Sequence, residues 1–311
     1  MTQFAFVFPG QGSQAVGMLD AWGDHPEVAR TLAEASAALG EDIGALIRSG
    51  PKEQLDLTTN TQPVMLTAGI ACYRAWIAET GLVPVAAAGH SLGEYTALVA
   101  SGALELADAL PLVRFRAQAM QEAVPVGVGA MYAVLGLDGE AVREGCAQAA
   151  AQSGEVIEAV NFNDPKQTVI AGTKAGAEKA AEILKAAGAK RALPLPVSAP
   201  FHSSLMKPAA ERLKERLAAT NFAAQAFPVV NNIDVAVTES AQALRDALYR
   251  QAFGPVRWVE VVQALKARGI GHIIECGPGK VLAGMVKRID GELQSATVLD
   301  PASLAEVKGM L

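Results

Sequence analysis

Short apolar runs alternate with longer helical segments along this chain. The first run, Phe4 to Phe8, ends at Pro9-Gly10, which predicts a buried strand followed by a turn. Helical patterns follow at about 26–39, 42–49, 61–80, 105–123 and 203–218. Further strands are expected at 84–88, 229–230, 273–275 and 298–299. Strands and helices that alternate in this way are typical of an α/β protein with a largely parallel sheet covered on both faces.

A second, smaller unit is predicted after the linker at 124–129, which is rich in Val and Gly. Its expected elements are a strand, a helix, two strands, a helix and a strand, at 131–135, 138–152, 156–160, 167–171, 174–187 and 190–197. This β-α-β-β-α-β order is that of a ferredoxin-like fold. We therefore expect residues 127–197 to form a ferredoxin-like subdomain, inserted into a core built from residues 1–126 and 198–311.

Ser91 lies at the centre of the most informative segment, Gly89-His90-Ser91-Leu92-Gly93. An apolar run precedes this segment and a helical pattern follows it, as in the nucleophile elbow G-x-S-x-G. The glycines tolerate the backbone angles of such a tight turn, and the N-terminus of the following helix favours a developing oxyanion. The bare pattern is common by chance in a chain rich in Ala and Gly. With the strand and the helix in place, it predicts serine acyl chemistry at Ser91.

The base that a serine nucleophile needs is most often a histidine, and the chain has four. His25 lies where a helix begins, His90 is expected to point away from the serine, and His272 precedes an apolar strand. His202 lies in a loop between a strand and a helix and follows the serine, which is the order found in α/β-hydrolases. We therefore expect His202 to be the base. No Asp or Glu stands out as a third triad member, which departs from the hydrolase pattern.

The glycine-rich segment after the first strand allows two interpretations. Gly10-x-Gly12-x-x-Ala15 matches a dinucleotide-binding fingerprint, but no second strand ending in an acidic residue follows about 20 positions on. That interpretation would make the chain a nucleotide-binding domain without catalytic activity. Alternatively, the segment is a turn that presents backbone N–H groups and Gln11 to the cleft that contains Ser91.

Arg116 has only apolar neighbours on its predicted helix, namely Leu112, Val113, Ala119 and Met120. A guanidinium in such a place must either extend its head to solvent or bind an anion, because an unpaired buried charge is costly. The sequence leaves both alternatives open.

Composition narrows the class of protein. The chain has 311 residues, 51% of them hydrophobic, and a net charge of -6, which disfavours nucleic acid or an anionic membrane surface as a partner. No apolar run reaches the roughly 18 residues of a membrane span, and the first run is too short for a signal peptide. Three widely separated cysteines without C-x-x-C indicate reduced thiols and no metal site. We therefore expect a globular, cytoplasmic protein.

Several motifs carry a family resemblance when they are taken together and in order. The first four are Gly10-Gln11-Gly12-Ser13-Gln14, Gly89-His90-Ser91-Leu92-Gly93-Glu94, Phe115-Arg116-Ala117 and Pro200-Phe201-His202-Ser203. The others are Asn161-Phe162-Asn163, Gln251 with Pro255-Val256-Arg257-Trp258, and Glu275-x-Gly277-Pro278-Gly279. This conjunction resembles the malonyl-CoA:acyl carrier protein transacylases, the stand-alone acyltransferases of type II fatty acid synthesis. The resemblance implies an α/β-hydrolase-like core with a ferredoxin-like insertion, in agreement with the pattern above.

The resemblance also implies catalytic roles. Ser91 would be acylated, with His202 as its base. A main-chain carbonyl, at the position matched by Gln251, would orient the histidine, and this would explain the missing acid. The backbone N–H groups of Gln11 and Leu92 would form the oxyanion hole.

The same resemblance implies three substrate-binding residues. Arg116 would pair with the free carboxylate of the malonyl group, and Asn161 would contact the substrate. Phe201 belongs to the form of its loop that is associated with malonyl, whereas selectors of branched methylmalonyl carry smaller or polar residues there.

The implied reaction is a ping-pong transfer without a cofactor or a metal. Malonyl-CoA acylates Ser91, and the phosphopantetheine thiol of a transiently bound acyl carrier protein then takes the malonyl group. Two other enzymes remain as alternatives, an α/β-hydrolase-type thioesterase and a trans-acting acyltransferase of a polyketide pathway. Arg116 and the inserted subdomain argue against the thioesterase.

Overall fold

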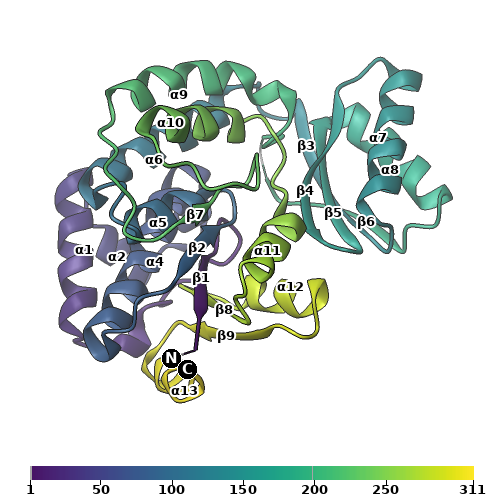
Figure 1. Ribbon diagram of the computed structural model, residues 1–311. Coiled ribbons are helices and arrows are strands. Elements are labelled where there is room, and N and C mark those ends of the chain that lie inside the picture. Colours follow the sequence, from purple (N-terminus) through teal and green to yellow (C-terminus); the bar gives the residue numbers. More distant parts are fainter. Residues whose placement is uncertain (1, 198) are drawn as a thin grey trace.

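The computed structural model of the chain describes residues 2–197 and 199–311. Met1 and Ser198, where we expect the two segments of the core to begin, lie outside the described residues. Figure 1 shows a large body, in which helices cover both faces of a parallel sheet, and a smaller antiparallel sheet beside it. The fold is therefore of the α/β class with a separate small sheet, as the sequence pattern predicts.

The parallel sheet has the strand order β7-β2-β1-β8-β9, and every neighbouring pair in it is parallel. Its strands are β1 (Phe4–Phe8), β2 (Ala86–Gly89), β7 (Val229–Val230), β8 (His272–Cys276) and β9 (Gln294–Val298). The central strand β1 is buried along its whole length, because both faces of the sheet are covered. This double covering explains why β1 is a continuous apolar run instead of an alternating one.

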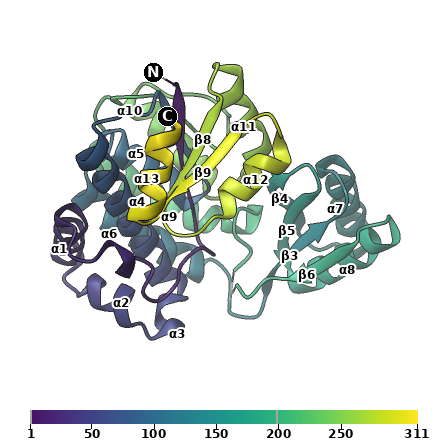
Figure 2. The ribbon, with the colours of Figure 1, turned by 90° about the horizontal axis from the view of Figure 1, so that it is seen from below.

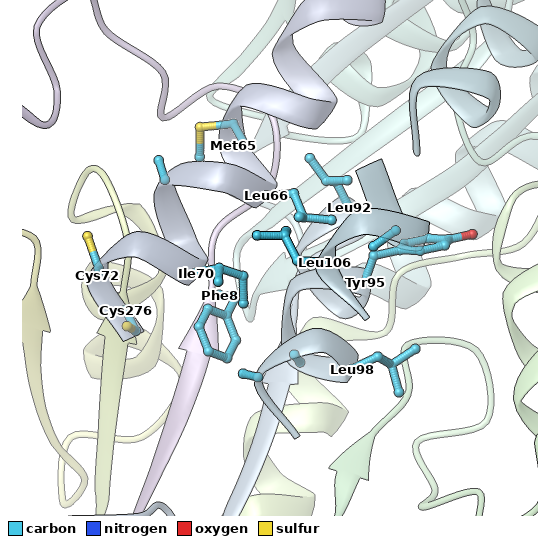
Figure 3. Packing of buried hydrophobic residues seen from close by; sticks show 14 of the residues in the cluster. Phe8, Met65, Leu66, Ile70, Cys72, Leu92, Tyr95, Leu98, Leu106 and Cys276 are labelled. Atoms are coloured by element: carbon cyan, nitrogen blue, oxygen red, sulfur yellow. The ribbon is translucent and has the colours of Figure 1, made fainter. Parts of the chain in front are cut away.

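One face of the parallel sheet carries most of the helices. These are α1 (Pro26–Leu39), α2 (Ile43–Ser49), α3 (Lys52–Leu55), α4 (Thr58–Thr80), α5 (Leu92–Ala100), α6 (Leu106–Glu122), α9 (Lys207–Ala219) and α10 (Ala241–Gln251), with short 3-10 turns at Asp20–Trp22 and Ser204–Met206. Phe4, Phe6 and Phe8 of β1 point into this layer. Figure 3 shows Phe8 beside Ile70 of α4, with Leu92 of α5 close to the same cluster.

The opposite face of the parallel sheet packs against α11 (Trp258–Ala267) and α12 (Val281–Ile289). Ala5 and Val7, the alternate residues of β1, belong to this second cluster. The C-terminal helix α13 (Pro301–Met310) packs against β9. None of the helices within residues 2–197 and 199–311 combines the length and the apolar character that crossing a membrane requires.

The small sheet has the strand order β4-β5-β3-β6 and is antiparallel throughout. Its elements are β3 (Gly129–Leu135), α7 (Gly139–Ser153), β4 (Ile157–Asp164), β5 (Gln167–Thr173), α8 (Lys174–Ala186) and β6 (Arg191–Pro194). Their order along the chain is the expected β-α-β-β-α-β, and α7 and α8 close an apolar cluster of their own. Figure 2 shows this unit on the side of the molecule opposite α1 and α2.

Several boundaries differ from those that the pattern predicts. The last strand of the small sheet ends at Pro194 instead of 197, because Pro194 and Pro196 have no N–H group to donate to a ladder. The strand expected at 298–299 covers Gln294–Val298. The pattern also did not locate the helices α10 to α13.

β4 is the strand that joins the small sheet to the core. The N–H of Phe162 donates to the carbonyl of Val256 (3.0 Å), and the N–H of Val256 donates to the carbonyl of Val160 (2.8 Å). Arg288 of α12 also pairs with the nearly buried Asp164 at the end of β4 (2.7 Å). The small sheet is therefore fixed to the segment that follows α10.

Two glycines allow β1, β2 and α5 to approach one another at the turn between β2 and α5. A Cβ atom at Gly93 would lie 2.0 Å from the carbonyl oxygen of Phe8, and one at Gly89 would lie 1.9 Å from the carbonyl carbon of Gly93. These distances are far below van der Waals contact, and the obstructing atoms are backbone atoms that cannot move aside.

Gly93→Ala should therefore destabilise the fold strongly. We expect the free energy of unfolding to fall by about 3 kcal/mol or more, because the added methyl group forces β1 and α5 apart. Urea denaturation followed by circular dichroism measures the change. Gly271→Ala is the matched control: its Cβ would meet no heavy atom within 4 Å, so its stability should stay within about 0.5 kcal/mol of wild type. Equal stability of the two variants would contradict this account of the turn.

Candidate active site

Ser91 occupies the apex of the turn between β2 and α5. Its φ angle is 51°, which is unusual for a residue with a side chain. The side chain of Asn232 holds this turn from both sides. The N–H of Ser91 donates to Asn232 Oδ1 (2.7 Å), and Asn232 Nδ2–H donates to the carbonyl of Gly89 (2.7 Å).

His202 lies directly against the hydroxyl of Ser91. Ser91 Oγ and His202 Nε2 are 2.7 Å apart, and His202 Nδ1 is 2.9 Å from the main-chain carbonyl of Gln251. A carbonyl can only accept a hydrogen bond, so Nδ1 carries the proton and Nε2 accepts from the serine hydroxyl. The structure therefore joins Ser91, His202 and Gln251 in one relay in which a carbonyl occupies the place of a carboxylate.

The environment of His202 keeps its ring neutral. Burial, and after it the positive charge of Arg116, lower the pKa of His202 to about 3. The bond to the Gln251 carbonyl acts in the opposite direction but is weaker. At neutral pH, His202 can thus accept a proton from Ser91.

Arg116 is 1% exposed, so its head does not extend to solvent. Its Nη1–H donates to Gln62 Oε1 (2.8 Å), and its Nη2–H donates to Gln251 Oε1 (3.0 Å) and Ser91 Oγ (3.2 Å). Its Nε has no partner, and no carboxylate of the described residues lies within 4.0 Å of the guanidinium. Of the two alternatives that the sequence leaves open, extension to solvent is therefore excluded. A buried cation whose contacts are neutral groups is suited to bind an anion.

Glu94 and Asn232 are parts of the site that sequence reasoning missed. Glu94 is 2% exposed, and its Oε2 accepts from the N–H of Asn232 (2.8 Å) and from Gln251 Nε2 (3.0 Å). Burial raises the pKa of Glu94 to about 7. The one available signal was positional: Asn232 lies two residues after β7, at the carboxyl edge of the parallel sheet where ligand sites of such folds lie.

A small cavity of about 130 Å³ opens onto Ser91 and Arg116. Its wall includes Gln11, Gln62, His90, Leu92, Met120, Met131, Asn161, Leu195, Val197, Phe201 and His202. A larger cavity of about 550 Å³ shares part of this wall and extends between the small sheet and α12. The two cavities adjoin one another, because Gln11, His90, Asn161, Leu195 and Val197 line both.

The remaining predicted residues lie around the inner cavity. The backbone N–H groups of Gln11 and Leu92 donate to no acceptor in residues 2–197 or 199–311, so both are free to bind a substrate oxygen. Asn161 Oδ1 is buried without a partner, and Asn161 borders both cavities. Phe201 belongs to the wall of the inner cavity. All eight predicted site residues are thus brought to one place, with Gln251 behind the cavity wall.

The glycine-rich segment at 10–14 lines the larger cavity. A Cβ atom at Gly10 would lie 2.6 Å from the carbonyl oxygen of His90, so this turn packs closely against the elbow. The arrangement agrees with a turn that borders the cleft of Ser91. The ring of His90 bonds to Asn163 of β4 (2.8 Å) and borders both cavities, although it makes no bond to Ser91.

The described part of the chain contains no group of three or more His, Cys, Asp or Glu side chains that could hold a metal ion.

Comparisons with known proteins show which family the chain is similar to. Residues 5–302 match the family described as acyl transferase domain. The malonyl CoA-acyl carrier protein transacylase of Escherichia coli (strain K12) is 53% identical over 306 residues, which are 98% of each chain. The solved acyl-carrier-protein S-malonyltransferase of Burkholderia pseudomallei 1710b is 66% identical, with a TM-score of 0.97 over 99% of this chain and 100% of that one. A solved malonyl-transacylase in complex with a type II PKS acyl-carrier protein is 49% identical, with a TM-score of 0.97 over 100% of both chains.

The fold and the serine site thus define an acyltransferase. Within that class, the chain belongs to the family of malonyl CoA-acyl carrier protein transacylases.

The His202 ring should remain neutral far below the usual histidine range. Because burial and Arg116 lower its pKa to about 3, the Nδ1–H tautomer is expected to persist at pH 5. The unfolded chain binds a proton near pH 6.5, so His202 should cost the native state about 1.4 kcal/mol per pH unit below that value. ¹⁵N NMR of histidine-labelled protein, assigned with His202→Asn, measures the tautomer. Protonation of Nε2 near pH 6.5 would show that the ring is not desolvated.

Proposed function

We propose that this chain transfers the malonyl group of malonyl-CoA to the phosphopantetheine thiol of an acyl carrier protein, through a malonyl ester of Ser91. One observation carries the proposal: the relay of Ser91, His202 and the Gln251 carbonyl shares a cavity with the buried Arg116, which lacks a carboxylate partner in the described structure. The relay supplies a nucleophile, and the arginine supplies a site for an acyl group that carries a negative charge.

In the first half-reaction, Ser91 Oγ attacks the thioester carbonyl while its proton moves to His202 Nε2. The carbonyl oxygen becomes an oxyanion and accepts hydrogen bonds from the N–H groups of Gln11 and Leu92, which lie at the inner cavity. Collapse of the intermediate breaks the carbon–sulfur bond. CoA leaves as the thiol, with the proton that His202 returns.

In the second half-reaction, the carrier-protein thiol takes the place of CoA. The larger cavity, which borders the inner one, offers the long phosphopantetheine arm a route to the ester. His202 accepts the thiol proton as sulfur attacks the ester carbonyl, and then returns it to Ser91 Oγ as the ester bond breaks. The products are the malonyl thioester of the carrier protein and free Ser91.

Arg116 selects the acyl group in this mechanism. A planar guanidinium grips a carboxylate through two parallel charge-assisted hydrogen bonds. Phe201 and Met120 supply apolar wall on the same cavity, and Asn161 offers a buried oxygen without a partner to a donor of the substrate. The site thus favours a short acyl group with a terminal carboxylate.

The pathway that the carrier protein serves is a separate question. The comparison with a malonyl-transacylase bound to a type II PKS acyl-carrier protein supports a polyketide carrier as a second candidate acceptor. A thioesterase would need water in place of the thiol. The buried arginine in the acyl cavity favours an enzyme that holds one charged acyl group for transfer over a thioesterase that hydrolyses acyl groups in general.

Three further properties belong to the proposal. Residues 127–197 act as the inserted subdomain and residues 1–126 with 198–311 as the core, in line with the separate small sheet. The reaction needs no cofactor, since the relay and the amides supply each step. The location is cytoplasmic, because Cys72, Cys146 and Cys276 are free and buried, as is usual in a reducing compartment.

Malonyl-CoA should add one malonyl group to the protein. Ser91→Ala should abolish this adduct with the fold intact, because no other nucleophile lies against His202 Nε2 in the described structure. Intact-protein mass spectrometry after brief exposure to malonyl-CoA measures the adduct, and circular dichroism checks the fold. Persistence of the adduct in Ser91→Ala would exclude Ser91 as the nucleophile.

Arg116→Ala should change the choice of acyl group. We expect kcat/KM for malonyl-CoA to fall by roughly two to three powers of ten, because loss of one partner of a buried charge pair costs about 2–5 kcal/mol. Transfer from acetyl-CoA, which has no carboxylate, should stay constant or rise.

The matched control is Arg114→Ala, because Arg114 lies on the same helix but pairs with Glu41 at the surface. It should leave both rates unchanged. A parallel fall of malonyl and acetyl transfer in Arg116→Ala would mean that the arginine is structural and that the carboxylate is recognised elsewhere.

A further inference from the structure

A second buried charge lies behind the acyl cavity, and the mechanism above does not use it. Arg116 Nη2–H donates to Gln251 Oε1 (3.0 Å), and Gln251 Nε2–H donates to Glu94 Oε2 (3.0 Å). One amide therefore bridges the guanidinium to the carboxyl group. Arg116 is 1% exposed, Glu94 2% and Gln251 0%, so no solvent screens the two charges.

The surroundings of Glu94 allow it to exchange a proton near neutral pH. Burial raises its pKa to about 7, against the hydrogen bonds from Gln251 and Asn232 and the positive charge of Arg116. Asp234, in the loop after β7, raises the pKa further. Tyr95, the next residue on the same helix, is also titratable, but burial raises its pKa to about 12, so it stays neutral. Asp234 itself is exposed and pairs with Arg250 through two hydrogen bonds (2.7 Å each), whereas Arg116 and Glu94 are buried.

We infer that Glu94 is the charge-balancing residue of the acyl site: it takes up a proton when an acyl group with a carboxylate binds at Arg116, and it releases that proton when the acyl group leaves. The inference rests on the proposed function, because it needs the malonyl carboxylate at Arg116. Glu94 touches no reacting atom and is a positioning residue that acts through Gln251 and Arg116.

Glu94 is expected to take up the proton because of the number of charges buried at the site. The free site holds one cation, Arg116, and the ionised Glu94 balances it through the amide of Gln251. A bound malonyl carboxylate adds a second anion to the same low-dielectric interior, and like charges raise each other's pKa. The malonyl carboxylate is in direct contact with the guanidinium, whereas Glu94 is one amide further away. The proton from solvent therefore goes to Glu94.

The pH dependence follows from this order. The pKa of Glu94 is higher in the malonyl-enzyme than in the free enzyme, so malonylation is accompanied by the uptake of a proton. It therefore becomes less favourable as the pH rises above about 7. Acetylation adds no charge and carries no proton. The preference for malonyl over acetyl should therefore decline with rising pH, and Glu94 sets that decline.

Glu94→Gln tests the inference, because glutamine keeps the shape and an acceptor oxygen but has no charge. In wild type, the ratio of kcat/KM for malonyl-CoA to that for acetyl-CoA should fall about sixfold between pH 6.5 and 8.5, for a coupling of about one pKa unit. In Glu94→Gln, the ratio should be flat and should exceed the wild-type ratio at pH 8.5. The ratio cancels the ionisation of the carrier thiol and any change in the relay.

Glu275→Gln is the matched control. Burial also raises the pKa of Glu275 to about 7, but its Oε2 accepts from the N–H of Ala283 at the start of α12 (2.8 Å), and it makes no bond to Arg116 or Gln251. Its ratio should follow the wild-type profile. A flat profile in Glu275→Gln would assign the titration to Glu275 and overturn the inference.

A second measurement uses wild type alone and does not depend on the folding of a variant. Wild-type protein mixed with malonyl-CoA at pH 8 in weak buffer should take up a fraction of a proton per acyl group, read with a pH indicator dye. Acetyl-CoA releases the same CoA thiol, so the difference between the two reactions isolates the uptake by Glu94. Glu94→Gln should show no difference.

The outcomes separate the two proposals. If Ser91 becomes malonylated but the wild-type ratio does not change with pH, or Glu94→Gln keeps the wild-type slope, Glu94 does not balance charge and the proposed function stands. If malonyl-CoA leaves no adduct on Ser91, the proposed function itself fails.

Discussion

The backbone turn at Ser91 is the constraint on which the rest of the site depends. A side chain at φ 51° costs about 1–3 kcal/mol of backbone strain. Gly89 and Gly93 let β1, β2 and α5 close around the turn, and the side chain of Asn232 bonds to the backbone on each side of it. These contacts hold the turn in place and keep the hydroxyl of Ser91 at the N-terminus of α5. The free N–H groups at the start of that helix then face the same cavity.

Burial gives this site its electrostatics. His202 is neutral because solvent cannot reach it and because Arg116 repels a second positive charge. Gln251 connects the parts: its carbonyl holds the histidine, its side-chain oxygen accepts from the arginine, and its side-chain nitrogen donates to Glu94 and to the carbonyl of Ser91. Loss of any one of these hydrogen bonds would leave a buried polar group without a partner, so each residue of the network constrains the positions of the others. The relay and the acyl pocket are for this reason one structure.

The small sheet is coupled to this network through β4. Its N–H and C=O groups bond to Val256, five residues beyond the carbonyl that orients His202. Asn163 of the same strand bonds to His90, the residue before Ser91. The small sheet therefore forms one wall of the cavities and also contacts the segments that position both members of the Ser91–His202 pair.

The sequence by itself determined the elements with strong periodicity and the chemistry of the turn. The apolar run of β1, the helix α1 and the order of the small sheet follow from local pattern, because burial on known faces imposes those periods. Ser91 followed from the glycines of the elbow, and His202 from the small number of histidines. Gln11 was indicated by the glycine-rich turn as well as by family resemblance. Leu92, Gln251, Phe201 and Asn161 were indicated only by that resemblance, since no local pattern distinguishes them. The amphipathic sequence of α10 carried a helical signal that could have located it.

Only the tertiary structure decided what the polar residues do. The sequence could not tell whether Arg116 reaches solvent, because that depends on α4 and α10, which cover its helix from distant parts of the chain. Glu94 reads as an ordinary residue of a helix start, yet Asn232 and Gln251, more than a hundred positions away, surround its carboxyl group. The pKa of Glu94 and the bridging position of the Gln251 amide both depend on residues that are distant in the sequence. The sequence gives the type of each residue. The charge state of a side chain depends on its burial and its hydrogen-bond partners, and these exist only when the chain has folded.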